Sequence, residues 1–387
     1  MDNYSVSFVK WIMFTTLLPY LEQIPGIPFI VFGFSLRGWA WMIIFLVSLF
    51  TLLRGNRVTM PVWIWLPFLI YIFGYNLVDY SFVGMQLSLQ YSVSLFVGFA
   101  ASSIYYSEQN IERIFRIFKS FMFLFILLCT LSYMLYSTTL YSAATVMTLT
   151  VFAAVFLYSY FSEHSRMALA GYFTCLIFPF LMVTRMAILS MLTVGVSHFA
   201  NRNFIRKGVM GAAIILVASM AFHSERFQSK SFGKKGGEYS DISFNNNNFN
   251  TSGRKAIYDV LKPGLMQHPV WGNGPRADLR LLEKKGFMVK EVHNDYLAVR
   301  YNYGYAGLLF LLFGFVCQAW FLFHKRHFLK DEPSFRLYAI ALTLFIPFFL
   351  LMYSDNVLKY SIFFGNYHFA IIGMLYSHLE TIWDDLT

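Results

Sequence analysis

EVHNDYLAVRYNYGYAGLLFLL, residues 291–312, places a histidine among polar residues and then enters a long apolar run. The apolar part continues to about residue 323, and a helix of about 20 mostly apolar residues is enough to cross the hydrocarbon core of a bilayer. The stretch therefore predicts a membrane-spanning helix with a titratable group, His293, at its N-terminal end. The chemistry open to His293 depends on the side of the membrane on which this end of the helix lies.

The composition of the whole chain is typical of a membrane protein. Of 387 residues, 57% are hydrophobic, 20% are aromatic and only 13% are charged, whereas a soluble domain carries about 25% charged residues. The net charge of +10 would suggest nucleic-acid binding in a soluble protein. Here it is better explained by basic cytoplasmic loops and an anionic ligand, so no nucleic-acid partner is expected. Cys129, Cys175 and Cys317 all fall in apolar runs and predict neither a disulfide framework nor a metal site.

Further apolar runs raise the expected number of transmembrane helices to about twelve. The runs lie near residues 8–24, 38–53, 61–77, 85–104, 115–136, 140–161, 167–182, 185–200, 207–223, 294–323, 335–353 and 361–379. The expected fold class is an all-α polytopic membrane protein. Nine helices would lie in residues 1–223, one large loop in 224–293, and three helices in 294–387.

The distribution of lysine and arginine predicts the orientation of the chain. Basic residues follow even-numbered spans, such as Arg54 and Arg57 after the second and Lys325 and Arg326 after the tenth. The loops after the third and fifth spans have none. The positive-inside rule then places both termini in the cytoplasm and the large loop outside it. His293, at the end of that loop, is expected on the outer face.

The large loop divides into a polar part and a part with helical patterning. Residues 224–253 are rich in glycine, serine, asparagine and lysine, which indicates a segment that orders only on binding. The next stretch, RKAIYDVLKPGLMQH, predicts an amphipathic helix capped near Ser252 and bent or ended at Pro263 and Gly264. WGNGPR predicts a turn, and ADLRLLEKKG predicts a short helix that stops at Gly286.

Arginines near the outer ends of spans are the first candidates for a site. Arg185 opens the eighth span, where the positive-inside bias makes an arginine unusual, so we favour a functional role over simple snorkelling. Arg300 follows His293 by about 10.5 Å of helical rise. It is expected either to line a polar cavity below the histidine or to pair with a backbone carbonyl. Arg254 and Arg276, taken alone, are typical of solvated loop arginines.

His293 taken alone is typical of a helix start. Asn294 or Asp295 can accept hydrogen bonds from the first helical N–H groups, and a lone histidine at such a place is more often structural than catalytic. The combination of a histidine with outward-facing arginines favours a functional site. Arginine binds phosphate oxygens with two parallel hydrogen bonds, and a histidine can take a proton from a hydroxyl at neutral pH.

This combination predicts a transferase that uses a lipid-linked donor. An extracytoplasmic enzyme has no nucleotide pool, so its activated sugar must arrive on a polyprenyl diphosphate, and arginines can stabilise the diphosphate leaving group without a metal or other cofactor. A flippase or transporter for lipid-linked sugars is the alternative from another class. The scarcity of Asp and Glu in the predicted spans argues against it, because proton-coupled transport needs carboxylates inside the membrane. A non-catalytic partner in a polysaccharide export complex is a third possibility.

Three motifs resemble the bacterial O-antigen ligase/polymerase family of membrane glycosyltransferases. They are TRMAILSML at the eighth span, GRKAIYDVLKPGLMQHPVWGNGP in the loop, and HNDYL followed by YGYAGLLFLL at the tenth span. The resemblance implies a GT-C-like fold with twelve spans and a periplasmic active site in the bacterial inner membrane. It also implies an undecaprenyl-diphosphate-linked glycan as donor, no metal, and inversion at the anomeric carbon.

The resemblance also assigns roles to residues. Arg185 and Arg254 would hold the diphosphate, and His293 would serve the acceptor hydroxyl as base or orienting group. Asn294, Arg276 and Arg300 are further candidates for substrate binding, as is Asp355 in the outer loop before the last span. The acceptor would be lipid A-core in a ligase or a growing glycan in a polymerase; the compact loop favours the ligase by a slight margin.

Overall fold

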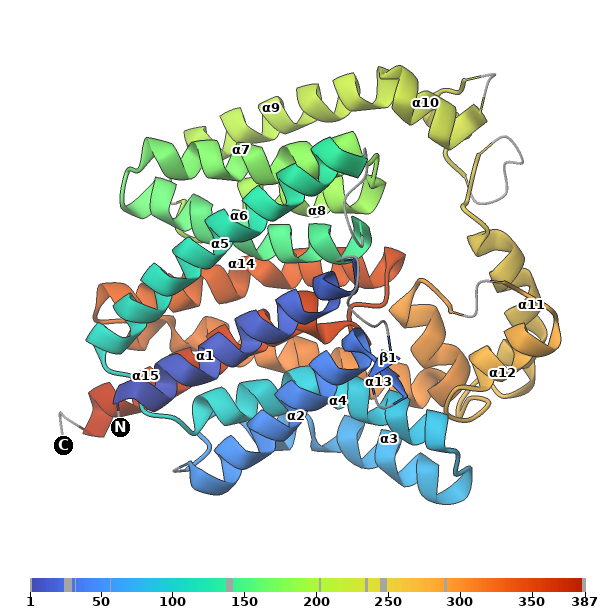
Figure 1. Cartoon of the computed structure of the whole chain (residues 1–387), viewed down its shortest axis with the longest axis horizontal. Coiled ribbons are helices and arrows are strands. Elements are labelled where there is room, and N and C mark those ends of the chain that lie inside the picture. Colours follow the sequence, from blue (N-terminus) through green and yellow to red (C-terminus); the bar gives the residue numbers. More distant parts are fainter. Residues whose placement is uncertain are drawn as a thin grey trace.

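The computed structural model is a bundle of long helices that lie side by side (Figure 1). It describes residues 2–23, 30–31, 33–55, 57–136, 142–201, 203–233, 236–243, 249–288 and 291–384. Within these ranges the β-structure is one antiparallel pair of two-residue strands, β1 (Ile30–Val31) and β2 (Phe34–Ser35). The expected class, an all-α polytopic membrane protein, is confirmed at this level.

Each of the twelve predicted spans coincides with an apolar helix. In chain order these are α1 (Asp2–Leu17), α2 (Leu36–Arg54), α3 (Leu66–Val78), α4 (Phe82–Ser102), α5 (Glu108–Tyr136), α6 (Ser142–Ser162), α7 (Arg166–Leu181), α8 (Arg185–Ser197), α9 (Phe204–His223), α13 (Asp295–His324), α14 (Glu332–Ser354) and α15 (Gly365–Asp384). Short 3-10 helices are η1 (Leu18–Gln23), η2 (Val62–Ile64), η4 (Tyr239–Asp241), η5 (Lys325–Phe328) and η6 (Ser361–Phe363).

Not all of these helices are long enough to cross a membrane alone. In the described part of the chain, seven are long and apolar enough: α2, α4, α5, α6, α9, α13 and α14. Helices α3 and α8 have 13 residues each, a rise of about 20 Å against a hydrocarbon core of about 30 Å. The count of twelve crossings therefore stays a prediction.

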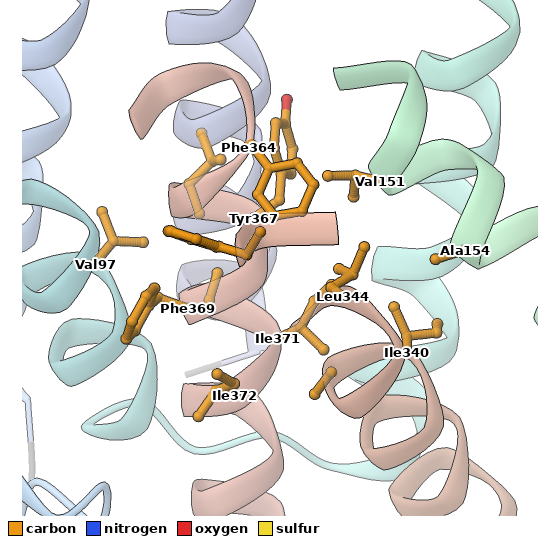
Figure 2. Close-up of a cluster of buried hydrophobic side chains, with 14 of the residues drawn as sticks. Val97, Val151, Ala154, Ile340, Leu344, Phe364, Tyr367, Phe369, Ile371 and Ile372 are labelled. Carbon is orange, nitrogen blue, oxygen red and sulfur yellow. The ribbon is translucent and has the colours of Figure 1, made fainter. Parts of the chain in front are cut away.

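Helix α15 lies at the centre of the bundle and packs against α4 and α14. Figure 2 shows its Phe369 beside Val97 of α4, with Leu344 of α14 near its other flank. Gly98 and Gly373 let α4 and α15 approach closely, since a Cβ on Gly373 would lie 2.3 Å from the Gly98 carbonyl oxygen. Small residues at such contacts are how helices associate within lipid, where no hydrophobic force drives them together.

Helices α10 (Glu225–Phe232), α11 (Arg254–Gln267) and α12 (Ala277–Lys284) gather at one end of the bundle, which we call the loop face (Figure 1). Helix α1 begins and α15 ends at the opposite side. Of the polar stretch expected before α11, residues 234–235 and 244–248 lie outside the described residues.

Helix α11 differs from the expectation in two ways. It runs through Pro263 and Gly264 without ending, and the residue before its first turn is Gly253 in a left-handed conformation, with no side-chain cap from Ser252. Pro263 is exposed, so water can satisfy the carbonyl that loses its hydrogen bond. Gly264 permits close packing, because a Cβ there would lie 2.8 Å from the Tyr301 ring of α13. The predicted stop of α12 at Gly286 is confirmed, and that glycine has φ +72°.

Helix α13, expected to be continuous, is broken at Gly304, where φ is +68° and ψ is −170°. The turn before α12 fills the break with backbone hydrogen bonds. Asn273 and Gly274 donate their N–H groups to the carbonyls of Tyr301 and Asn302, and the N–H groups of residues 305 and 306 donate to the carbonyls of residues 269 and 270. Irregular backbone is tolerated near a membrane where protein groups satisfy it. This junction fixes the large loop to α13.

We expect Gly304→Ala to destabilise the fold by about 2 to 4 kcal/mol, since the backbone region is open almost solely to glycine. An added Cβ would also lie 2.1 Å from the Val270 carbonyl oxygen. Gly253→Ala is the control: its φ is +78° but nothing lies within 4 Å of a Cβ, so about 1 kcal/mol is expected. The measurement is unfolding in mixed micelles followed by tryptophan fluorescence. Equal losses of unfolding free energy in the two variants would mean that the junction at Gly304 does not stabilise the fold.

Candidate active site

A cavity of about 520 Å³ opens at the loop face beside His293; we call it the histidine cavity. It lies between α11, the segment before α13, and α13 itself. Its lining residues are Arg254, Ile257, Tyr258, Val292, His293, Asn294, Tyr296, Leu297, Arg300, Tyr305, Leu308 and Tyr353. Four of the seven site residues predicted from sequence, Arg254, His293, Asn294 and Arg300, are thus brought together.

The packing of α11 against α13 determines one wall of the histidine cavity. Ile257, Leu261 and Leu265 recur every fourth residue on α11 and form a small core with Ala298 and Tyr301 of α13. This spacing puts all three on one helical face. Arg254 and Tyr258, on the same helix, line the cavity.

Arg254 lies at the start of α11 and reaches the end of α14. Its Nη2 donates a hydrogen bond of 2.8 Å to the Ser354 carbonyl oxygen. The neighbouring Asp355, a predicted substrate-binding residue, does not line the histidine cavity. Burial raises the pKa of Asp355 to about 6, although Arg254 acts in the opposite direction. Asp355 therefore feels the charge of Arg254, whose hydrogen bond goes to the preceding residue, Ser354.

His293 precedes α13, and Asn294 is the helix cap. The Asn294 Oδ1 accepts a hydrogen bond of 2.9 Å from the Leu297 N–H, while Asp295 accepts one of 3.0 Å from the Leu358 N–H and so secures the loop between α14 and α15. Among the described residues, none forms a hydrogen bond with the His293 ring. Burial lowers the pKa of His293 below its ordinary 6.5, with Arg254 and Lys359 acting in the same direction and Glu291 against them. The imidazole is therefore neutral at pH 7 and able to accept a proton.

Arg300 lines the histidine cavity, as the first of its two expected roles requires. Its guanidinium carbon lies 4.3 Å from the centroid of the Tyr305 ring. Tyr305 and Leu308 lie further along α13, so the lining extends over about 18 Å of helix from Tyr296. The cavity is charged near α11 and becomes aromatic and aliphatic along α13.

Arg185 does not line the histidine cavity, although the sequence predicted it as part of one site. Its Nη2 donates a hydrogen bond of 3.1 Å to the Asn250 carbonyl oxygen, and its guanidinium lies 4.8 Å from the Phe249 ring centroid. The charges of Arg185 and Arg254 nevertheless repel one another, so the two groups are neighbours. The segment before α11, through Phe249 and Asn250, therefore positions the Arg185 side chain near the histidine cavity.

Arg276 lines a second cavity, of about 380 Å³, that we call the glutamate cavity. Its lining residues are Ser35, Arg37, Gly38, Trp41, Val83, Gln86, Gln90, Arg276, Glu291, Lys359, Tyr360 and Ile362. The structure thus places Arg276, predicted as a substrate-binding residue, in a different cavity from His293. The reason is tertiary: the turn that follows α11 places Arg276 on the side of α13 that faces α2 and α4.

Glu291 is the centre of the polar contacts in the glutamate cavity. It pairs with Lys359, accepts hydrogen bonds from the Tyr360 hydroxyl at 2.8 Å and the Asn356 amide at 3.2 Å, and lies 3.7 Å from Arg276 Nη2. Burial acts to raise the pKa of Glu291, but Lys359, Tyr360 and Arg276 lower it to about 2. Glu291 is therefore ionised throughout the physiological range.

Sequence reasoning missed Glu291, Lys359 and Tyr360. A signal was present for Lys359, because it lies in the predicted outer loop before the last span and so runs against the positive-inside bias. The same holds for Arg37, at the predicted outer end of the second span. Glu291 stands two residues before His293 in the motif already singled out.

Comparison with known families adds a match to part of the chain. Residues 151–312 match the family model described as O-antigen ligase. No curated protein matches the chain. The matched region runs from α6 into α13 and contains Arg185, Arg254 and His293. Residues 151–312 therefore carry an O-antigen ligase family domain, and this domain supports an assignment to the O-antigen ligase/polymerase family.

Proposed function

We propose that the protein is a glycosyltransferase that moves a preassembled glycan from undecaprenyl diphosphate to an acceptor hydroxyl on lipid A-core. The observation that carries the proposal is the histidine cavity, in which a neutral His293 lies beside Arg254 and Arg300 and above an apolar wall. The match of residues 151–312 to the O-antigen ligase family supports the same reaction class.

The shape of the histidine cavity suits a lipid-linked diphosphate. Arg254, and Arg185 beside it, would bind the phosphate oxygens, which guanidinium groups do with paired hydrogen bonds. The apolar side chains along α13, including Leu297 and Leu308, would contact the first isoprene units. A soluble nucleotide sugar has no lipid chain that would contact such an apolar wall.

In the proposed step, an acceptor hydroxyl oxygen attacks the anomeric carbon of the donor glycan. Its proton passes to a ring nitrogen of His293, and the bond between the anomeric carbon and the diphosphate oxygen breaks with inversion. The electron pair of that bond leaves with the diphosphate, whose added charge Arg254 and Arg185 stabilise. The imidazolium then releases its proton to water. The chain thus supplies a base and a charge clamp.

The proposed orientation puts the loop face in the periplasm, the bundle in the bacterial inner membrane, and both termini in the cytoplasm. Basic residues at the opposite end, among them Arg54, Arg57, Lys325 and Arg326, support it through the positive-inside rule. A repeat-unit polymerase would use the same donor site with a growing glycan as acceptor, so the accumulated intermediate must distinguish the two activities.

His293→Ala should abolish surface polymer in a strain that lacks the chromosomal copy of the gene, because the acceptor hydroxyl loses its base. In a ligase mutant, long glycans accumulate on the lipid carrier; in a polymerase mutant, single repeats still reach the acceptor. The measurement is a polysaccharide gel with an immunoblot for protein level. His268→Ala, at the exposed end of α11, is the control and should give a normal ladder. A normal ladder from His293→Ala would refute the proposal.

Arg254→Lys should lower turnover about as much as Arg254→Ala, by roughly tenfold or more, because a point charge does not reproduce the paired hydrogen bonds of a guanidinium. Lys262→Ala, on the exposed face of the same helix, serves as the control. The test is glycan transfer by the purified chain in liposomes, with unfolding midpoints measured in parallel, since Arg254 also bonds to Ser354. Near-normal turnover of folded Arg254→Lys would remove Arg254 from the clamp.

Turnover should rise with pH through an apparent pKa below 6.5 and then level off, because the base acts in its neutral form and burial lowers the pKa of His293. The profile is measured as kcat/KM in liposomes. Since burial raises the pKa of Asp355 to about 6, Asp355→Asn is the control and should retain the acidic limb. If the Asp355→Asn variant loses the fall in turnover at acidic pH, the titrating group is the Asp355 carboxyl and not His293.

A further inference from the structure

The histidine cavity and the glutamate cavity share one short segment of chain. Glu291 lines the glutamate cavity, whereas Val292, His293 and Asn294 line the histidine cavity. The segment from 291 to 294 is therefore a partition with a different cavity on each side. A group-transfer reaction needs two substrates to meet at one base, and this partition carries the proposed base.

The glutamate cavity has an excess of positive charge. Arg37, Arg276 and Lys359 line it, together with one carboxylate, that of Glu291, and Arg37 lies 3.9 Å from a second carboxylate, that of Glu22. Glu291 is already engaged by Lys359, Tyr360 and Asn356. An incoming ligand would therefore meet cations and not a free carboxylate, which favours a ligand that carries a carboxylate or a phosphate.

The same cavity offers donors and acceptors suited to hydroxyl groups. Gln86 and Gln90 lie four residues apart on α4, a spacing that puts both on one face, and both line the cavity. Gln90 is only 6% exposed, yet its amide forms no hydrogen bond with any residue in the described ranges. The Trp41 Nε1 is likewise buried and without a partner there. A buried donor such as the Trp41 Nε1 normally has a partner, so it indicates a polar ligand.

Arg276 is held in an unfavourable backbone conformation. Its φ is +60° and its ψ is 23°, in the left-handed region that costs a residue with a side chain about 1 kcal/mol or more. Its side chain is 12% exposed and points towards Glu291. Strain that is retained at a cavity wall indicates that the position of this guanidinium matters for binding.

We propose that the glutamate cavity is the acceptor subsite and that it binds a saccharide carrying a carboxylate or a phosphate. The proposal rests on the proposed transferase function. Arg276 and Lys359 bind the anionic group, Gln86, Gln90 and Trp41 bind sugar hydroxyls, and the acceptor hydroxyl reaches His293 across the 291–294 segment. The donor occupies the histidine cavity on the other side.

The binding test uses the full chain in nanodiscs of zwitterionic lipid, with glucuronic acid, glucose 6-phosphate and glucose as probes. Saturation-transfer NMR should detect the two anionic sugars and show glucose binding about tenfold more weakly, as expected for the loss of one charge-assisted interaction. Arg276→Gln should remove this preference. Arg280→Gln is the matched control: it lies one turn further on, is half exposed and pairs with Asp79, so the preference should remain.

Two further arms separate the outcomes. Gln90→Leu should weaken all three probes alike, because it removes hydroxyl contacts and not charge. Nanodiscs that contain phosphatidylglycerol should give the same probe affinities; displacement of the probes by that lipid would assign the cavity to a lipid headgroup and overturn the proposal. An unchanged preference in folded Arg276→Gln would overturn it as well.

A kinetic arm distinguishes failure of this proposal from failure of the proposed function. With isolated acceptor and lipid-linked donor, Arg276→Gln should raise the KM for acceptor about tenfold and leave the KM for donor unchanged, while His293→Ala abolishes transfer. If His293→Ala abolishes transfer but Arg276→Gln leaves the acceptor KM unchanged, the proposed transferase function is supported and the proposed acceptor subsite is refuted. If the His293→Ala variant transfers glycan at the normal rate, the proposed function is refuted, and the glutamate cavity is no acceptor subsite.

Discussion

The backbone hydrogen bonds between the turn at residues 268–274 and the break in α13 hold the loop face together. Gly304 opens the helix, and four main-chain bonds from the turn close it again. Helix α11 enters the turn and α12 leaves it, so the positions of Arg254 and Arg276 both depend on this junction. His293 stands at the other end of the same broken helix. A single local irregularity thus sets the relative placement of both cavities.

The charges near the loop face are distributed so that few remain uncompensated. Glu291 is satisfied by Lys359, Tyr360 and Asn356, and Asp295 by the backbone of the loop that carries them. Three cations, Arg37, Arg276 and Lys359, face two carboxylates, Glu22 and Glu291, around the glutamate cavity, and His293 lies on the other side of the 291–294 segment as a neutral imidazole. Buried charge is costly unless paired, and the retained surplus is positive, which agrees with anionic substrates on both sides of the 291–294 segment.

The elements governed by local rules could be predicted from the sequence, and those governed by tertiary contacts could not. All twelve apolar runs became helices, and Asn294 and Gly286 perform the cap and stop that their residue types indicate. The break at Gly304 escaped notice because apolar residues continue on either side of it. Pro263 was expected to bend or end α11, but the helix continues to Gln267, and the exposed position of the proline removes most of the penalty. The cavity that Arg276 lines could not be predicted, since only the folded turn decides which side of α13 it faces.

The bonds that anchor the loop to α13 join main-chain atoms, which has a consequence for how such a protein can diverge. Besides the glycines that permit the close approach, a small set of side chains adds to the attachment. The Asn273 amide donates to the Tyr301 carbonyl, Asn302 Oδ1 accepts from the Asp278 N–H, and α11 packs on α13 through its buried aliphatic face. The recognition surfaces of the two cavities can therefore accumulate substitutions while the scaffold beneath them is inherited intact, as in other folds that carry variable loops on a fixed frame.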